Sequence, residues 1–126
     1  MEEKNQKIVD FRDLHAWQEG HVLVLMVYTI TKKFPKEELF ALVSQMRRAG
    51  ISITSNIAEG FSRQSYKEKI QFYSMALGSL TELQSQMLIA KDIQYISLEE
   101  YEKMLQQSII AHKLISGLIR SSRGHF

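Results

Sequence analysis

Residues 65–92 decide the fold and read SYKEKIQFYSMALGSLTELQSQMLIAKD. Ser65 followed by Glu68 matches the capping box that begins many helices. Apolar side chains then recur at the three- and four-residue spacing of one helix face. These side chains are Ile70, Tyr73, Leu77, Leu80, Leu83, Met87 and Ile89. The stretch therefore predicts one long amphipathic helix that frays near residues 92–96.

Similar signals predict two helices before this stretch. Asp13 is a suitable N-cap for a helix over residues 13–33. Pro35 ends that helix and suits the first turn of the next, because its missing N–H would have no partner there. The next helix is predicted over residues 36–59, with Gly60 as its C-cap.

A fourth helix is predicted over residues 98–120, since Ser97 and Glu100 repeat the capping-box pattern. Short links force neighbouring helices to run antiparallel, so the sequence predicts an all-α, up-and-down four-helix bundle. The bundle is expected over residues 13–120 as a single domain. Residues 1–12 are expected to form a polar extension and residues 121–126 a flexible tail.

Two of these helices carry more apolar residues than one inward stripe requires. The predicted inward positions are Leu14, Trp17, Val24, Leu25 and Tyr28 in the first helix, and Leu98, Tyr101, Leu105, Ile109, His112, Ile115 and Ile119 in the last. The additional apolar positions are Val22, Leu23, Met26, Val27 and Ile30, then Ile110, Leu114 and Leu118. They indicate either a wide core stripe or a subunit interface, and we favour the interface because exposed apolar patches often mark association.

Composition excludes several classes of protein. With no cysteine, the 126-residue chain has no disulfides, no thiolate metal ligands and no thiol nucleophile. The N-terminus lacks a secretory signal pattern, and the longest apolar run, residues 22–28, is too short to span a bilayer. A cytoplasmic protein is expected. The formal net charge of +2 permits nucleic-acid binding without requiring it.

The predicted helix over residues 36–59 contains an unusual run of polar side chains. Together with Glu82 of the following helix they define a polar seam, made of Arg47, Arg48, Ser52, Asn56, Glu59 and Glu82. In one interpretation the seam is structural, with an arginine paired to Glu82 to fix helix register. In the other, Arg47 and Arg48 form an arginine row that binds an anion.

Basic and aromatic residues also alternate around the start of the third helix. Tyr66 and Phe72 accompany Arg63, Lys67 and Lys69, a composition typical of surfaces that contact phosphates and stack on bases. The ordinary alternative is a solvated helix face. The residues predicted to bind nucleic acid are Arg47, Arg48, Arg63, Lys67 and Lys69.

No catalytic pattern accompanies these residues. Phosphate-loop, dinucleotide-loop, HExxH and nucleophile-elbow motifs are absent from the sequence. The four histidines, His15, His21, His112 and His125, have no ligand spacing, and no glutamate has a histidine three residues later. We therefore expect no enzymatic activity, no metal and no cofactor.

Short motifs follow one another in a defined order along the chain. They are FRDL at residues 11–14, AWQ at 16–18, FP at 34–35, VSQMRRA at 43–49, SI at 52–53, SNIAEG at 55–60, ALGSL at 76–80 and EL at 82–83. In this order they resemble the four-helix-bundle proteins encoded in intervening sequences of bacterial 23S ribosomal RNA genes. The resemblance implies a homopentamer. A related branch, the accessory protein of diversity-generating retroelements, implies partnership with a reverse transcriptase and nucleic acid.

Two functional hypotheses follow. The first is a non-enzymatic oligomer that binds RNA or DNA as an accessory factor of a ribonucleoprotein or of a reverse transcriptase. The second is a protein–protein interaction scaffold with no nucleic-acid role, in which the arginines are purely structural.

Overall fold

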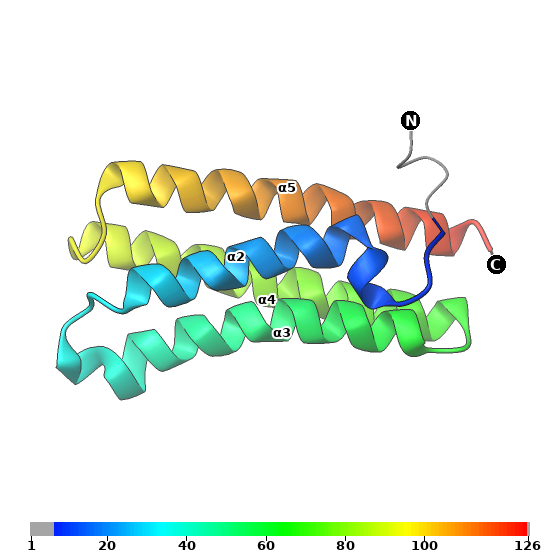
Figure 1. Ribbon diagram of the computed structural model, residues 1–126, viewed down its shortest axis with the longest axis horizontal. Helices are drawn as coiled ribbons and strands as arrows, with labels where there is room; N and C mark the ends of the chain where they lie inside the picture. The colour runs from blue at the N-terminus through cyan, green and yellow to red at the C-terminus, as the bar shows by residue number, and fades with distance from the viewer. Residues whose placement is uncertain (1–6, 126) are drawn as a thin grey trace.

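The computed structural model describes residues 7–125 and contains four long helices (Figure 1). They are α2 (His15–Thr31), α3 (Ser44–Ser62), α4 (Tyr66–Asp92) and α5 (Leu98–Arg123). Within residues 7–125 no strand is present. The prediction of an all-α chain with four helices is confirmed.

The helices pack side by side, and the chain reverses direction between each helix and the next (Figure 1). α2 packs between α3 and α5, and α4 packs between the same two helices from the other side. Along the α3–α4 pair, Ser52 lies beside Ser79 and Gly60 lies beside Tyr73. Residues with rising numbers along α3 therefore lie beside residues with falling numbers along α4, which shows that the two helices run in opposite directions.

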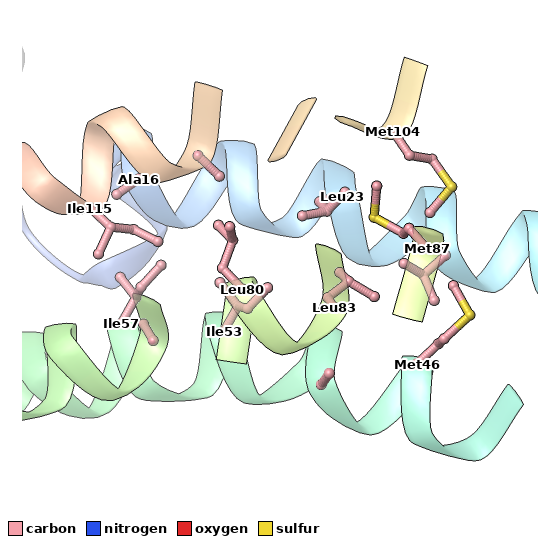
Figure 2. Close-up of a cluster of buried hydrophobic side chains, with 14 of the residues drawn as sticks. Ala16, Leu23, Met46, Ile53, Ile57, Leu80, Leu83, Met87, Met104 and Ile115 are labelled. Atoms are coloured by element: carbon pink, nitrogen blue, oxygen red, sulfur yellow. The ribbon is translucent and has the colours of Figure 1, made fainter. Parts of the chain in front are cut away.

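Every helix contributes side chains to one continuous core. Leu23, Met46, Leu83, Met87 and Met104 are no more than 1% exposed. In Figure 2 the three methionines gather toward one end of the core, and Ile57 faces Ile115 toward the other. Burial of these apolar side chains is the main stabilising contribution to the bundle.

The N-terminal boundary differs from the prediction. Asp13 does not cap the first long helix but ends a short 3₁₀ turn, η1 (Phe11–Asp13). Its Oδ2 accepts hydrogen bonds from the backbone N–H groups of Val9, at 2.8 Å, and Asp10, at 3.2 Å. α2 then begins at His15. The segment predicted as a polar extension over residues 1–12 therefore includes an ordered turn, whose Phe11 ring packs edge-on against Trp17 at 5.2 Å.

The predicted second helix is divided into three parts. A 3₁₀ turn, η2 (Lys36–Glu38), leads into a π-helical segment, η3 (Leu39–Val43), before α3 begins. Gly60 is not the C-cap, since α3 continues to Ser62. An added Cβ at Gly60 would lie 2.7 Å from Cε1 of Tyr73, so this glycine allows α3 and α4 to approach closely.

The later boundaries follow the sequence signals more closely. Ser65 accepts a hydrogen bond from the Glu68 N–H at 3.1 Å, and α4 ends at Asp92 as predicted. The capping box of Ser97 and Glu100 is confirmed in full.

The predicted flexible tail over residues 121–126 is wrong for its first three residues, because α5 continues to Arg123. Ser122 is only 5% exposed, so the last turn of α5 packs against the bundle. Arg120 and Arg123 also complement the helix dipole there. Residue 126 lies outside the described residues.

The inward face of α2 also differs from the predicted one. Leu23 and Val27 are fully buried, whereas Leu25 is 53% exposed. In α5, Leu98, Ile109 and His112 face outward, and Met104, Ser108 and Ala111 occupy the core instead. The apolar residues of α2 cover most of its circumference, so periodicity alone was compatible with more than one inward face.

Gly60, at the α3–α4 interface, and Gly78, exposed on α4, provide a matched stability test. Gly60→Ala should lower the free energy of unfolding by about 1–3 kcal/mol, because the new methyl group overlaps the buried Tyr73 ring. Gly78→Ala should instead raise it by about 0.5–1 kcal/mol, since no atom lies within 4 Å of the position that a Cβ would take there and alanine favours helix. Urea denaturation of both variants measures the difference. Equal effects would contradict the close approach at Gly60.

Candidate functional site

The polar seam lies mainly between α3 and α4. Nη2 of Arg48 is 3.3 Å from Oε2 of Glu82, so the ion pair expected from the sequence is present. Gln86 donates to the same carboxylate oxygen at 3.1 Å. One turn farther along α3, the hydroxyls of Ser52 and Ser79 are 2.7 Å apart. The Arg48–Glu82 and Ser52–Ser79 contacts cross the helix interface and join facing residues of α3 and α4.

The seam continues toward the α3–α4 turn. Asn56 Nδ2 donates to the Ser52 carbonyl at 2.8 Å and lies 3.1 Å from the Ser52 hydroxyl. Glu59 forms an ion pair with Arg63 at 2.6 Å, across one turn of chain. Apart from Arg47, each side chain of the seam therefore has a polar partner on α3, on α4 or in the turn between them.

Arg47 points away from this seam. Its Nε donates to the Thr31 hydroxyl at 3.0 Å, and its guanidinium lies 4.5 Å from the centre of the Tyr28 ring. Both partners belong to α2, whereas Arg48 pairs with α4. The predicted arginine row does not form, because adjacent residues on a helix face directions about 100° apart.

Arg63 and Lys69, two of the predicted nucleic-acid contacts, hold the α3–α4 turn together. The Arg63 guanidinium pairs with Glu59 and lies 4.6 Å from the centre of the Phe72 ring. Lys69 Nζ donates to the Phe61 carbonyl at 2.7 Å, which satisfies an acceptor at the end of α3. Burial lowers the pKa of the Lys69 ammonium. Both cations therefore have internal partners.

Lys67 is exposed at an end of the bundle that also carries basic residues not singled out from the sequence. The Tyr66 ring at the start of α4 stacks on the His125 ring at 4.0 Å, which brings the C-terminus of α5 alongside. Arg120 and Arg123 are exposed in this last turn of α5. We call Lys67, Arg120 and Arg123 the basic end. The helical spacing of Ile115, Ile119 and Ser122 was the sequence signal that could have extended α5 this far.

The histidines lie apart from one another and mostly contact aromatic rings or hydroxyls. His21 stacks on Trp17 at 4.7 Å, and the Nδ1 atom of His112 is 3.4 Å from the Ser116 hydroxyl. Among residues 7–125, no group of three or more His, Asp or Glu side chains is arranged to hold a metal ion.

An open cavity of about 710 Å³ lies at the α4–α5 loop. The charged side chains along it pair with one another: Lys33 binds Glu100, and Lys91 lies 3.2 Å from Asp92. Lys33 and Glu100 join the segment after α2 to the start of α5, and the hydrogen-bonded ion pair holds the pKa of the Glu100 carboxyl below its ordinary value. We interpret these ion pairs as structural contacts near the helix ends.

Two apolar grooves flank α2. The α2/α5 groove, of about 460 Å³, is lined by Val22, Leu25, Met26, Thr29, Ile30 and Met104, with Lys33, Glu100 and Lys103 beside them. The α2/α3 groove, of about 440 Å³, is lined by Tyr28, Leu39, Phe40, Val43, Arg47 and Ile51, with Ser44 and Arg48. Phe40 is 90% exposed, and Leu25 and Leu39 are about half exposed. Phe40 was not among the residues singled out from the sequence.

Comparison with known proteins identifies the family. A family model described as 23S rRNA-intervening sequence protein matches residues 12–117. The chain belongs to this family. The resemblance stated from the short motifs is therefore confirmed.

A solved structure supports the fold. It is a protein of unknown function from the S23 ribosomal protein family of Bacteroides thetaiotaomicron VPI-5482, with 24% sequence identity and a TM-score of 0.76. The alignment covers 82% of the present chain and 97% of the Bacteroides chain. None of the curated proteins matches the chain. Along residues 7–125, no helix combines the length and apolarity needed to cross a bilayer.

Lys69 and Lys67 allow the structural and surface roles of the basic residues to be separated. Lys69→Ala should lower the free energy of unfolding by about 1 kcal/mol, because it removes the hydrogen bond to the Phe61 carbonyl. Lys67→Ala should change it by less than about 0.5 kcal/mol, since this side chain is exposed. Chemical denaturation of the two variants checks this. An equal loss in both would contradict the structural role assigned to Lys69.

Proposed function

We propose that the protein is a non-enzymatic, self-associating helical bundle whose oligomer serves as an interaction scaffold. The observation that carries this proposal is the pair of apolar grooves on the two sides of α2. Exposed apolar side chains in such grooves favour association, because burial removes them from water. Val22, Leu25 and Phe40 would be covered in the assembled form.

The resemblance to intervening-sequence proteins supports a homopentamer as the assembled form. A cyclic assembly requires each copy to present two different surfaces, one to each neighbour. Grooves on both sides of one helix meet this requirement. Arg48 pairs with Glu82, and Arg63 pairs with Glu59. These ion pairs support the scaffold hypothesis, in which the arginines have structural roles.

Light scattering coupled to size-exclusion chromatography tests self-association. We expect the wild-type protein to have five times the mass of one chain. Leu25→Glu should lower this mass, because it places a charge in the α2/α5 groove at a position that is 53% exposed and not needed for folding. Met75→Glu, at a 51% exposed position on α4, is the matched control and should leave the mass unchanged. A monomeric wild-type protein would rule the proposal out.

A second candidate function is RNA binding at the basic end. It is favoured by Lys67, Arg120 and Arg123, which are exposed at the end of the bundle where the Tyr66 ring stacks on the His125 ring. Cationic side chains bind phosphates, and aromatic rings can stack on unpaired bases. Membership of a family named for 23S rRNA intervening sequences makes structured RNA the first ligand to test. This site replaces Arg63 and Lys69 as the proposed contact, because both have internal partners.

Fluorescence anisotropy with labelled structured RNA across a salt series tests this second function. The double variant Lys67→Glu/Arg123→Glu should weaken binding at least tenfold and flatten the salt dependence, because fewer phosphate contacts release fewer counterions. The charge-matched variant Lys32→Glu/Lys36→Glu changes exposed lysines at the opposite end of the bundle and should bind more nearly like wild type. Equal weakening by both would mean that net charge, not the basic end, governs affinity.

A further inference from the structure

Phe40 projects from a short segment that is held in place. It lies in the π-helical segment η3, a rare geometry that often occurs at functional positions. The Glu38 carboxylate anchors this segment, since it accepts hydrogen bonds from the Leu42 N–H at 3.3 Å and the Tyr95 hydroxyl at 2.9 Å. Tyr95 also packs against the buried Phe34 at 5.2 Å. The hydrogen bonds of Glu38 therefore hold the segment that carries Phe40, whose ring is 90% exposed.

The α2/α5 groove has the shape and chemistry to receive such a ring. The buried Met104 lies beneath it, and the exposed Val22 and Leu25 border it. Lys33 and Glu100, which form an ion pair, also line the groove. Its volume of about 460 Å³ is within the range of pockets that accept small ligands, and an aromatic side chain buries about 150–250 Å².

Phe40 and the α2/α5 groove lie at the same level of the bundle on different sides of α2. Tyr28 lines the α2/α3 groove with Phe40, and Met26, Thr29 and Ile30 line the α2/α5 groove. These four residues of α2 fall within little more than one helical turn. Two copies placed side by side in the same orientation would therefore bring Phe40 of one copy level with the α2/α5 groove of the other.

We infer that Phe40 of one copy inserts into the α2/α5 groove of a second copy, between Leu25 and Met104. The inference rests on the proposed self-association and names the two surfaces that form its interface. The projecting ring and the groove are different surfaces, so the contact is heterologous. The copy that inserts its ring keeps a free groove, and the copy that receives the ring keeps a free ring. Repetition of such a contact closes into a ring when the rotation between copies permits it.

Two variants that each disable one half of the contact test this inference. Phe40→Ala removes the ring, and Leu25→Glu disables the groove; both positions are exposed, so each monomer should fold. Either variant alone should fall from the wild-type mass to that of one chain. When mixed, the intact Phe40 of the Leu25→Glu chain can enter the intact groove of the Phe40→Ala chain, so the mixture should form a one-to-one heterodimer.

Sedimentation velocity over a concentration series distinguishes the outcomes, with circular dichroism as the check on folding. If wild type is oligomeric and Phe40→Ala keeps the same mass, the inference is overturned while self-association stands. If both variants are monomeric and the mixture never forms a heterodimer, the ring and the groove do not bind each other and the inference also fails. If wild type is itself monomeric, the proposed function and the inference fail together. If Phe40→Ala stays oligomeric but loses binding to labelled RNA, Phe40 contacts nucleic acid instead of a second copy.

Discussion

The close packing of α3 against α4 is the contact on which the rest of the structure depends. Gly60 lets α3 approach the buried Tyr73 ring, and the Ser52–Ser79 hydrogen bond continues the contact along the interface. The Arg48–Glu82 pair lies farther along the same interface. The Ser52–Ser79 and Arg48–Glu82 contacts join α3 to α4 and favour one register between the two helices, while the Arg48 and Glu82 side chains remain exposed to solvent.

α2 has the most apolar sequence of the four long helices. Leu23 and Val27 face the core, yet Val22 and Leu25 remain exposed beside an apolar groove. Arg47 is the main polar contact of α2 with α3, through Thr31 and Tyr28. Helices that are apolar over most of their circumference are usually covered on more than one side. We propose that another copy of the chain covers the second side of α2.

The helices could be predicted from the sequence because their signals are local. The capping box of Ser97 and Glu100 and the apolar repeat of residues 65–92 need only a few neighbouring residues to act. The inward face of α2 could not be predicted, because it depends on where α3 and α5 lie. The π-helical segment at Leu39–Val43 and the role of Gly60 also depend on partners distant in sequence, Tyr95 and Tyr73.

The candidate site was predictable in smaller part. The Arg48–Glu82 pair could be predicted because the two residues lie at the same level of two adjacent antiparallel helices. The different direction of Arg47 could not, because it depends on how α3 is rotated about its own axis. Arg123 was missed because residues 121–126 were assigned to a flexible tail, and Arg120, the last residue of the predicted helix, was not singled out. Phe40 could not be recognised, since an aromatic residue in a helical stretch is ordinarily buried and only the structure gives its exposure of 90%.

Hydroxyl-radical footprinting at increasing protein concentration would test most directly whether a second copy covers the two sides of α2 in the assembled protein. Labelling of Phe40 and Leu25 should fall as the protein assembles, because both side chains leave solvent. Labelling of Met75, which is 51% exposed on α4, should stay constant and serves as the internal reference. Labelling of Phe40 and Leu25 that is as strong in the assembled protein as in the dilute one would contradict coverage of α2 by a second copy.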